Sequence, residues 1–296
     1  MPMMQIILAL IIALQPPGTL EAEVRARIAA DSTTRTAVAY WPLAANADSL
    51  LIHDNWTYHA ASTMKVPVMI QLYRMVDAGT LTLDAKITLQ NQFTSIVDGS
   101  PYALDMADDS DSSLYARVGE PVTVQELIYL MITRSSNLAT NVLIDLAGPA
   151  QVTKTMHELG APHIHVLRGV EDIPAYRAGL INTVTAHDLA VVMAAIAQER
   201  AASPASCKAM LAILLKQEFD DGIPAGLPPN TPVAHKTGWV DGLVDHDAAI
   251  VYPPSGAPYV LVVLNQGNAG DSVTRHLTAD ISRLVWAHAT GTGIGQ

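Results

Sequence analysis

The chain has 296 residues, of which 50% are hydrophobic and 15% are charged, so it has enough apolar side chains for a large core. Its 17 basic and 28 acidic residues give a formal net charge of −11, which excludes nucleic acid as the expected partner because phosphate binding needs clustered lysine and arginine. The lone cysteine, Cys207, excludes an intramolecular disulfide and a cysteine-rich zinc site.

The chain begins with an apolar run from Ile6 to Leu14, which is followed by Gln15 and two prolines. The run is too short to span a bilayer and has the length of the apolar region of a secretory signal, although no lysine or arginine precedes it. We therefore expect residues 1–17 to be a signal peptide and the mature protein to be periplasmic or secreted, without stable membrane insertion. The alternative is an apolar N-terminus that is not a signal.

Two short strands are expected next, at residues 36–41 and 49–53. From residue 63 to 78 apolar residues recur at helical spacing, and Gly79 follows as a natural C-terminal cap. Residues 92–119 are irregular and contain the aspartates Asp98, Asp105, Asp108, Asp109 and Asp111. They lack the turn glycine and the terminal glutamate of a calcium loop, so we expect a solvated loop and not a calcium site.

The middle of the chain is predicted to be helical. Thr123 and Glu126 have the spacing of a capping box that opens a helix. Further helices are expected after Asn137, over residues 150–159 and over residues 189–197.

After residue 228 the pattern returns to strands and ends in an amphipathic helix over residues 271–288. The order of strands, helices and strands predicts an α/β (α+β) fold, in which an antiparallel sheet flanked by helices is built from both chain ends. We expect residues 20–60 and 205–296 to form this α/β domain, with an all-α domain inserted at residues 61–204.

Ser62 and Lys65 stand at the start of the first predicted helix, in the pattern S-x-x-K. Side chains three positions apart share a helix face, so the Lys65 amine is expected to reach the Ser62 hydroxyl. A serine hydroxyl needs a base to become a nucleophile, and a lysine can be that base only when burial or another cation lowers its pKa. A backbone N–H at the helix start can stabilise an oxyanion. Alone, the pattern also fits an ordinary helix cap.

Two more short patterns follow. S-S-N at residues 135–137 lies between two predicted helices, where a hydroxyl can relay a proton and an amide can face a ligand. K-T-G at residues 236–238 opens a predicted strand, where a cation and a hydroxyl can hold a substrate carboxylate while the strand edge pairs with its amide. A plain interhelical turn and an exposed surface strand are the alternatives.

Together and in this order, the three patterns resemble the motif set of class A β-lactamases and penicillin-binding proteins. The resemblance runs from about residue 22 to the C-terminus and includes S-T-M-K-V-P, T-V-x-E-L and H-K-T-G. Glu171 lies 36 residues after Ser135, where class A enzymes carry an Ω-loop glutamate that penicillin-binding proteins generally lack. The chain is therefore identified as a class A β-lactamase-like serine hydrolase.

The resemblance implies a role for each matching residue. Ser62 would attack, Ser135 would pass a proton to the leaving nitrogen, and Glu171 would activate the water that releases the acyl group. Whether Lys65 or Glu171, acting through water, takes the proton from Ser62 stays open. The implied substrate-binding residues are Asn137, Lys236, Thr237 and Trp239, with Arg275 as a substitute carboxylate binder.

The chain departs from the family pattern near these residues. Ser136 replaces the aspartate of S-D-N, and Ala175 replaces an asparagine that helps to hold the water. The segment 171–182 is about two residues short, and Asn182 replaces the aspartate that normally pairs with Arg168, which should therefore lack its usual partner. We expect complete acylation chemistry and altered deacylation.

The region after K-T-G also differs from the family. Trp239 stands where a small residue is usual, but its backbone N–H can still complete an oxyanion hole with that of Ser62. Asp245 occupies the position of a frequent strand arginine, so Arg275 is the expected substitute.

Two histidines offer a different chemistry, because His163 and His165 form the H-x-H pattern of zinc ligands. Leu167 stands where the metallo-β-lactamase pattern has aspartate, so no metal site is expected. The predicted function is a serine β-lactamase without a cofactor, acting as a monomer on a small β-lactam through a covalent acyl-serine. Two alternatives stay open, namely a D,D-peptidase or esterase using the same serine, and a penicillin sensor that stays acylated.

Overall fold

The computed structural model describes residues 19–45, 47–267 and 271–292, so the predicted signal segment lies outside the described residues. Its centre is an antiparallel five-stranded sheet in the order β2-β1-β11-β10-β9. The strands are β1 (Thr34–Pro42), β2 (Leu50–Ile52), β9 (Val233–Val240), β10 (Val244–Val251) and β11 (Tyr259–Gly267). Sequentially distant segments thus pair side by side, since β1 lies against β11 over its whole length.

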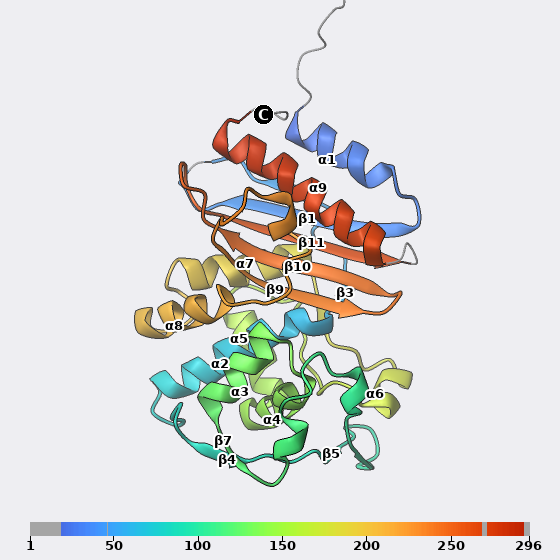
Figure 1. Ribbon diagram of the computed structural model, residues 1–296, viewed down its shortest axis with the longest axis vertical. Coiled ribbons are helices and arrows are strands. Elements are labelled where there is room, and N and C mark those ends of the chain that lie inside the picture. The colour runs from blue at the N-terminus through green and yellow to red at the C-terminus, as the bar shows by residue number, and fades with distance from the viewer. Residues whose placement is uncertain (1–18, 46, 268–270, 293–296) are drawn as a thin grey trace, which may run out of the picture.

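Helices from the two chain ends cover one face of the sheet (Figure 1). They are α1 (Leu20–Ala29) and α9 (Asp271–Thr290), and the short 3₁₀ helix η4 (Pro224–Gly226) packs against α9. The core of this layer joins sheet residues such as Val38 and Leu261 to Ile281 of α9. Thr19 caps α1, because its Oγ1 accepts from the amide of Ala22 at 3.3 Å.

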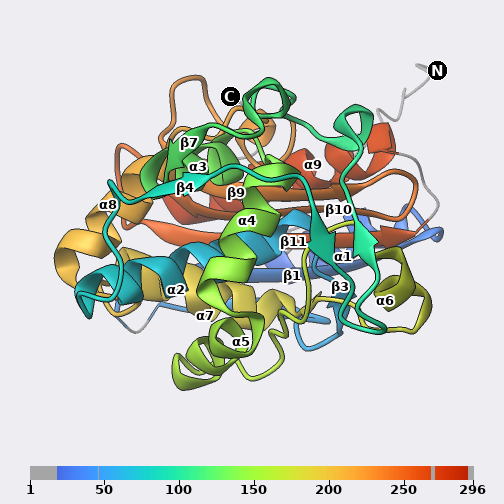
Figure 2. The same cartoon turned by 90° about the horizontal axis from the view of Figure 1, so that it is seen from below.

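A thicker layer of helices covers the other face (Figure 2). It contains α2 (Lys65–Asp77), α3 (Val124–Thr133), α4 (Asn137–Ala147), α5 (Pro149–Glu158), α7 (Ala186–Ala197) and α8 (Pro204–Leu214). Every residue of α2 from 65 to 73 is buried, since helices surround α2. The fully buried helix therefore positions its first residue, Lys65, inside the protein.

The remaining elements are short. They are the 3₁₀ helices η1 (Ala61–Met64), η2 (Met106–Asp108) and η3 (Tyr115–Arg117), the helix α6 (Ile173–Arg177), and the strand pairs β3 (Tyr58–His59) with β8 (Thr183–Val184), β4 (Lys86–Thr88) with β7 (Pro121–Thr123), and β5 (Phe93–Thr94) with β6 (Pro101–Tyr102). Among the described residues, no helix combines the length and the apolar character needed to cross a bilayer.

The predicted fold class is confirmed, with an antiparallel sheet from both chain ends and helices inserted between its strands. Three details differ from the prediction. The first predicted helix divides into η1 and α2, K-T-G lies in the middle of β9, and α1, α6 and α8 were not predicted.

The acidic segment 92–119 is mostly exposed, as a solvated segment would be, but it is more ordered than a plain loop. It contains β5, β6 and two 3₁₀ helices, and Asp111 is buried. Several of the aspartates accept from backbone amides: Asp111 accepts from Ser113 N at 3.1 Å and Asp109 accepts from Asn137 N at 2.9 Å. Local composition could not reveal this because Asn137 is distant in sequence.

Candidate active site

Ser62 lies in η1, where the chain passes from β3 into α2. The preceding residue, Ala61, has a φ of 44°, a conformation that non-glycine residues seldom adopt. Ser62 remains partly exposed, whereas Thr63 and Met64 are buried. The strained turn therefore presents one hydroxyl at the surface of an otherwise buried segment.

Strand β9 passes directly beside this turn. A Cβ atom added to Gly238 would lie 3.0 Å from Thr63 N and 3.2 Å from Ser62 N, closer than side chains normally pack against backbone. Glycine at 238 thus allows the edge strand to approach the amide of Ser62. This contact brings the K-T-G strand and the candidate nucleophile to one place.

Lys65 is fully buried at the start of α2. Its Nζ donates to Ser135 O at 2.6 Å, to Ser135 Oγ at 3.0 Å and to Asn137 Oδ1 at 3.1 Å. Burial lowers the pKa of Lys65 to about 7, although the nearby charges of Asp109 and Glu171 oppose the shift. A substantial fraction of neutral amine is then available at neutral pH, which is what a lysine base requires.

Ser135 connects the two buried lysines of the site. Lys236, also fully buried, donates from Nζ to Ser135 Oγ at 3.1 Å and to Thr237 O at 2.8 Å. Burial lowers the pKa of Lys236 well below its usual value, and the charge of Lys65 lowers it further. Ser135 itself has a φ of 56°. Its hydroxyl, with an amine on each side, is placed for relaying a proton.

Glu171 is the third site residue in the left-handed region, with a φ of 61°. Its Oε2 accepts from Asp105 N at 3.1 Å, while Oε1 is buried without a hydrogen-bond partner among the described residues. Burial raises the pKa of Glu171, and the charges of Asp108 and Asp109 raise it further. Hydrogen bonds from Asp105 N and the Asn137 side chain oppose this rise of the pKa. A buried carboxylate oxygen with no protein partner is available for a water molecule.

The residues on either side of Glu171 are held firmly. Asn141 of α4 accepts from Val170 N at 2.7 Å through Oδ1 and donates to Val170 O at 3.1 Å through Nδ2. On the other side, Asp172 accepts from Ser95 Oγ at 2.7 Å and from Ile96 N at 3.0 Å. Glu171 is therefore fixed between α4 and the segment that contains β5.

Arg168 and Asn182 close the loop through main-chain hydrogen bonds, and within the described part of the chain Arg168 lacks a carboxylate partner as expected. Arg168 finds main-chain partners, since Nε donates to Leu180 O and Nη1 donates to Gly169 O, both at 2.8 Å. Asn182 Oδ1 accepts from Arg168 N at 3.2 Å, and Asn182 Nδ2 donates to Arg168 O at 2.9 Å. The shortened loop thus keeps its closure without a carboxylate. Ala175, which replaces the expected asparagine, is buried in α6.

The predicted carboxylate-binding residues divide between the two sheet faces. Thr237 and Trp239 alternate with Lys236 along β9, so their side chains belong to the face covered by α9. On that face Arg275 of α9 pairs with Asp221 at 2.7 Å and with Asp245 at 3.2 Å. A substrate carboxylate would compete with two protein carboxylates for Arg275, so Lys236 is the better placed of the expected binders.

A buried ion pair lies immediately behind the K-T-G strand. His235 Nδ1 donates to Asp247 Oδ1 at 3.0 Å, and His235 Nε2 lies 3.5 Å from Asp220 Oδ1. Burial lowers the pKa of His235, but the two carboxylates outweigh it and raise the pKa to about 9. Asp247 also accepts from Ile223 N at 2.9 Å, so it ties β9 to the loop before η4.

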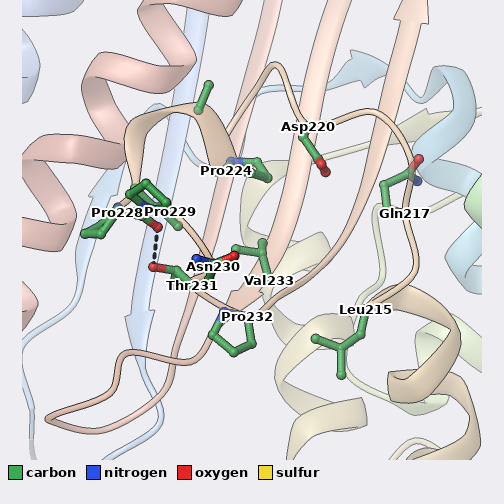
Figure 3. Close-up of a pocket in the computed structure, with 12 residues that line it drawn as sticks. Leu215, Gln217, Asp220, Pro224, Pro228, Pro229, Asn230, Thr231, Pro232 and Val233 are labelled. Carbon is green, nitrogen blue, oxygen red and sulfur yellow. Dashed lines mark hydrogen bonds between the residues drawn. The ribbon is translucent and has the colours of Figure 1, made fainter.

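A cavity of about 560 Å³ opens beside the start of β9 (Figure 3). Proline and other residues of the segment 224–233 form most of its wall, and Asp220 lies at its side. No residue predicted for catalysis or substrate binding lines this cavity. Within the described ranges, no cluster of three histidine, cysteine or acidic side chains is arranged to hold a metal ion.

The structure thus brings Ser62, Lys65, Ser135, Asn137 and Lys236 together around one junction of η1, α2, α4 and β9. Contacts that the sequence did not predict come from Asn141, Asp105 and Asp109. They act through backbone amides or across long sequence separations, so no local pattern signals them.

A serine at a strained turn with two buried lysines beside it is an arrangement suited to acyl transfer. Residues 19–289 match the family model described as the Beta-lactamase enzyme family. The chain belongs to this family.

The relatives found by sequence are distant. The β-lactamase of Streptomyces albus G is 29% identical over 168 residues, which cover 55% of this chain and 54% of the relative. The β-lactamase of Bacillus licheniformis is 29% identical over 51% of this chain and 50% of the relative. The chain spans about half the length of the curated relatives it matches.

Solved structures match over most of their length. A β-lactamase from Sphaerobacter thermophilus superposes with a TM-score of 0.77 at 28% identity, covering 92% of this chain and 98% of that chain. PBP-A superposes with a TM-score of 0.77 at 27% identity, covering 93% and 97%. A mutant of PBP-A, solved as an acyl-enzyme complex with penicillin G, has a TM-score of 0.76 at 27% identity, covering 91% and 95%.

Proposed function

We propose that the protein is a class A-like serine β-lactamase that hydrolyses the β-lactam amide through a covalent acyl-serine. The observation that carries the proposal is the placement of Ser135 Oγ between Lys65 Nζ at 3.0 Å and Lys236 Nζ at 3.1 Å, beside the strained turn of Ser62. Family membership supports the general chemistry of the site.

In the acylation step, Ser62 Oγ attacks the lactam carbonyl carbon and loses its proton either to the neutral Lys65 amine or, through a water, to Glu171. The amides of Ser62 and Trp239 stabilise the oxyanion. The C–N bond then breaks, and Ser135 gives its proton to the lactam nitrogen and regains one from a lysine. Lys236 holds the substrate carboxylate, and Asn137 faces the substrate.

In the deacylation step, Glu171 takes a proton from a water that attacks the ester carbonyl. The ester C–O bond then breaks and the proton on Glu171 is passed to Ser62 Oγ, so that Ser62 leaves as the alcohol and the site returns to its starting state. The raised pKa of Glu171 and its unpartnered Oε1 support this assignment. No step needs a cofactor. We also propose that the protein is exported and acts as a monomer.

Intact-mass measurement with a penicillin, together with turnover of a chromogenic cephalosporin, tests the proposal. The wild-type protein should gain the mass of the penicillin and turn over the cephalosporin, and Ser62→Ala should do neither. An alanine variant that still becomes labelled would place the nucleophile elsewhere.

A D,D-peptidase or esterase is the second candidate, favoured by the likeness to PBP-A and by Ala175. A methyl group at 175 cannot hold a water, so release of the acyl group could depend on Glu171 alone. Release of D-alanine from a peptide ending in D-alanyl-D-alanine, without cephalosporin turnover, would establish this candidate instead. A protein that stays acylated by the penicillin and turns over neither substrate would instead be a sensor.

A further inference from the structure

Asp109 binds the beginning of α4 from a segment that supplies none of the residues assigned to the reaction. Its carboxylate accepts from Asn137 N through both oxygens and from Leu138 N through Oδ2, all at 2.9 Å. Tyr115 OH donates to the same Oδ2 at 2.9 Å. A carboxylate at this end of a helix satisfies amides that lack partners within the helix and interacts favourably with the helix dipole.

These bonds lie next to the reacting groups. Asn137 follows Ser135 by two residues, and its side-chain Oδ1 accepts from Lys65 Nζ at 3.1 Å. Ser135 has a left-handed backbone, with a φ of 56°, which needs support from its surroundings. Ser136 caps α4 through its own Oγ, which accepts from Ala139 N at 3.3 Å. Asp109 therefore satisfies the amides that Ser136 does not reach.

We propose that Asp109 is a positioning residue for the acyl-transfer reaction, which fixes the turn carrying Ser135 and Asn137 and places a negative charge near Lys65 and Glu171. The expected effect of Asp109 on the acylation rate rests on the proposed function. The anchoring of α4 is independent of any substrate.

The charge of Asp109 acts on groups from several elements. It raises the pKa of Lys65 on α2, of Glu171 on the loop before α6 and of Tyr115 on η3. Asp105 and Asp108 add negative charge from its own segment, to Tyr115 and to Glu171 respectively. Removing the charge of Asp109 should therefore lower the pKa of both Lys65 and Glu171.

The test compares Asp109→Asn with Asp111→Asn. Asparagine keeps the shape and one acceptor oxygen at 109, so the fold should persist. Asp111 belongs to the same segment and is also buried, but its carboxylate accepts from Ser113 N at 3.1 Å and Ser113 Oγ at 3.0 Å and pairs with Arg134 at 3.8 Å, without accepting from an amide of α4. The two measurements are amide hydrogen exchange over residues 135–141 and the pH profile of acylation by a chromogenic cephalosporin.

In Asp109→Asn we expect exchange at Asn137 and Leu138 to become about tenfold faster, because a charged acceptor is lost. Acylation should slow by roughly 10- to 100-fold through misplacement of the turn. The acidic limb of its pH profile should move to lower pH, because the neutral form of Lys65 becomes easier to reach. A purely structural role would lower the rate without moving the limb.

Asp111→Asn should leave both the exchange at 137–138 and the acidic limb at their wild-type values. Unchanged exchange in Asp109→Asn, an unmoved limb, or equal effects of the two variants would each overturn the inference. If the wild-type protein is not acylated at all, the proposed function fails, and the exchange experiment alone still decides whether Asp109 anchors α4.

Discussion

The charge states of the two lysine side chains in this site depend on their burial. Lys65 and Lys236 are both fully buried, and each lies within hydrogen-bond distance of Ser135 Oγ. Two ammonium groups beside one hydroxyl are costly in a medium that solvates charge poorly, so the neutral form of at least one amine is favoured. A lysine that would stay protonated on the surface can therefore act as a base here.

The pH dependence of acylation should report this effect. Since the pKa of Lys65 lies at about 7, acylation should rise with pH through the neutral range and then level off. Lys65→Arg keeps the positive charge and cannot lose a proton near neutral pH, so it should lose about 10²–10⁴-fold of the rate. Pre-steady-state absorbance of a chromogenic cephalosporin measures the rate. A wild-type profile that is flat across neutral pH would contradict the assignment of Lys65 as base.

Glu171 should matter more for release of the acyl group than for its formation. Glu171→Gln keeps the shape and removes the basicity, so deacylation should slow by about 10²–10⁴-fold and the acyl-enzyme should accumulate. The intact mass of Glu171→Gln should show a persistent adduct. Its absorbance trace should show a burst that is followed by very slow turnover.

Glu199→Gln provides a matched control, because Glu199 is also left-handed, with a φ of 56°, and pairs with Lys208 on the surface. It should behave as the wild type. Wild-type turnover by Glu171→Gln would instead favour the peptidase or sensor alternatives.

At the scale of elements, the site depends on how closely β9 approaches η1. Gly238 leaves no space for a side chain, since its Cβ would contact the amides of Ser62 and Thr63. Strand β9 is the edge of the sheet, so the same approach that positions the nucleophile leaves one strand edge free to pair with a substrate.

Gly238→Ala should therefore push β9 away from η1 and reduce acylation by about 10- to 100-fold. Gly79→Ala separates this effect from a general loss of stability, because Gly79 has open space around it and a φ of 70°. The control should lose about 1 kcal/mol of stability and keep its acylation rate. Thermal unfolding and acylation kinetics of both variants decide the matter, and equal acylation rates would show that the close approach is not required.

At the scale of the whole molecule, buried charge behind the sheet couples stability to pH. His235 has a pKa of about 9, above its usual value of 6.5, because Asp247 and Asp220 bind its cation. A raised pKa contributes stability that is complete below about pH 6.5 and is lost as pH rises through 9, corresponding to about 3 kcal/mol. Lys65 acts in the opposite direction, because its lowered pKa costs stability below about pH 7 and this cost disappears at higher pH.

Asp220→Asn isolates the contribution of His235. It removes an exposed partner and leaves Asp247 in place, so the folded-state pKa of His235 should fall, and the alkaline loss of stability should be smaller and end at lower pH than in the wild type. Asp221→Asn is the control, because Asp221 pairs with Arg275 and not with His235. Urea unfolding across pH 6 to 10 measures the difference. Identical pH profiles for wild type and Asp220→Asn would mean that Asp220 does not bind the His235 cation.

The sequence predicted those residues of the site that belong to short motifs. S-x-x-K, S-S-N and K-T-G each occupy a few consecutive positions, and the chemistry of serine, lysine and carboxylate limits what such groups can do together. The alternation of strand and helix patterns predicted the fold class in the same way, because side-chain periodicity follows directly from backbone geometry.

Tertiary structure alone decided the rest, because the remaining effects join residues far apart in the chain. The expected partner of the Lys65 amine was Ser62, yet its hydrogen bonds go to Ser135 and Asn137, seventy or more positions away. The charge state of Lys65 depends on complete burial, and the support of α4 depends on Asp109 from a segment whose composition indicated only a solvated loop. Sequence thus determined which groups are present and their local order, whereas packing determined which of them touch and in what charge state.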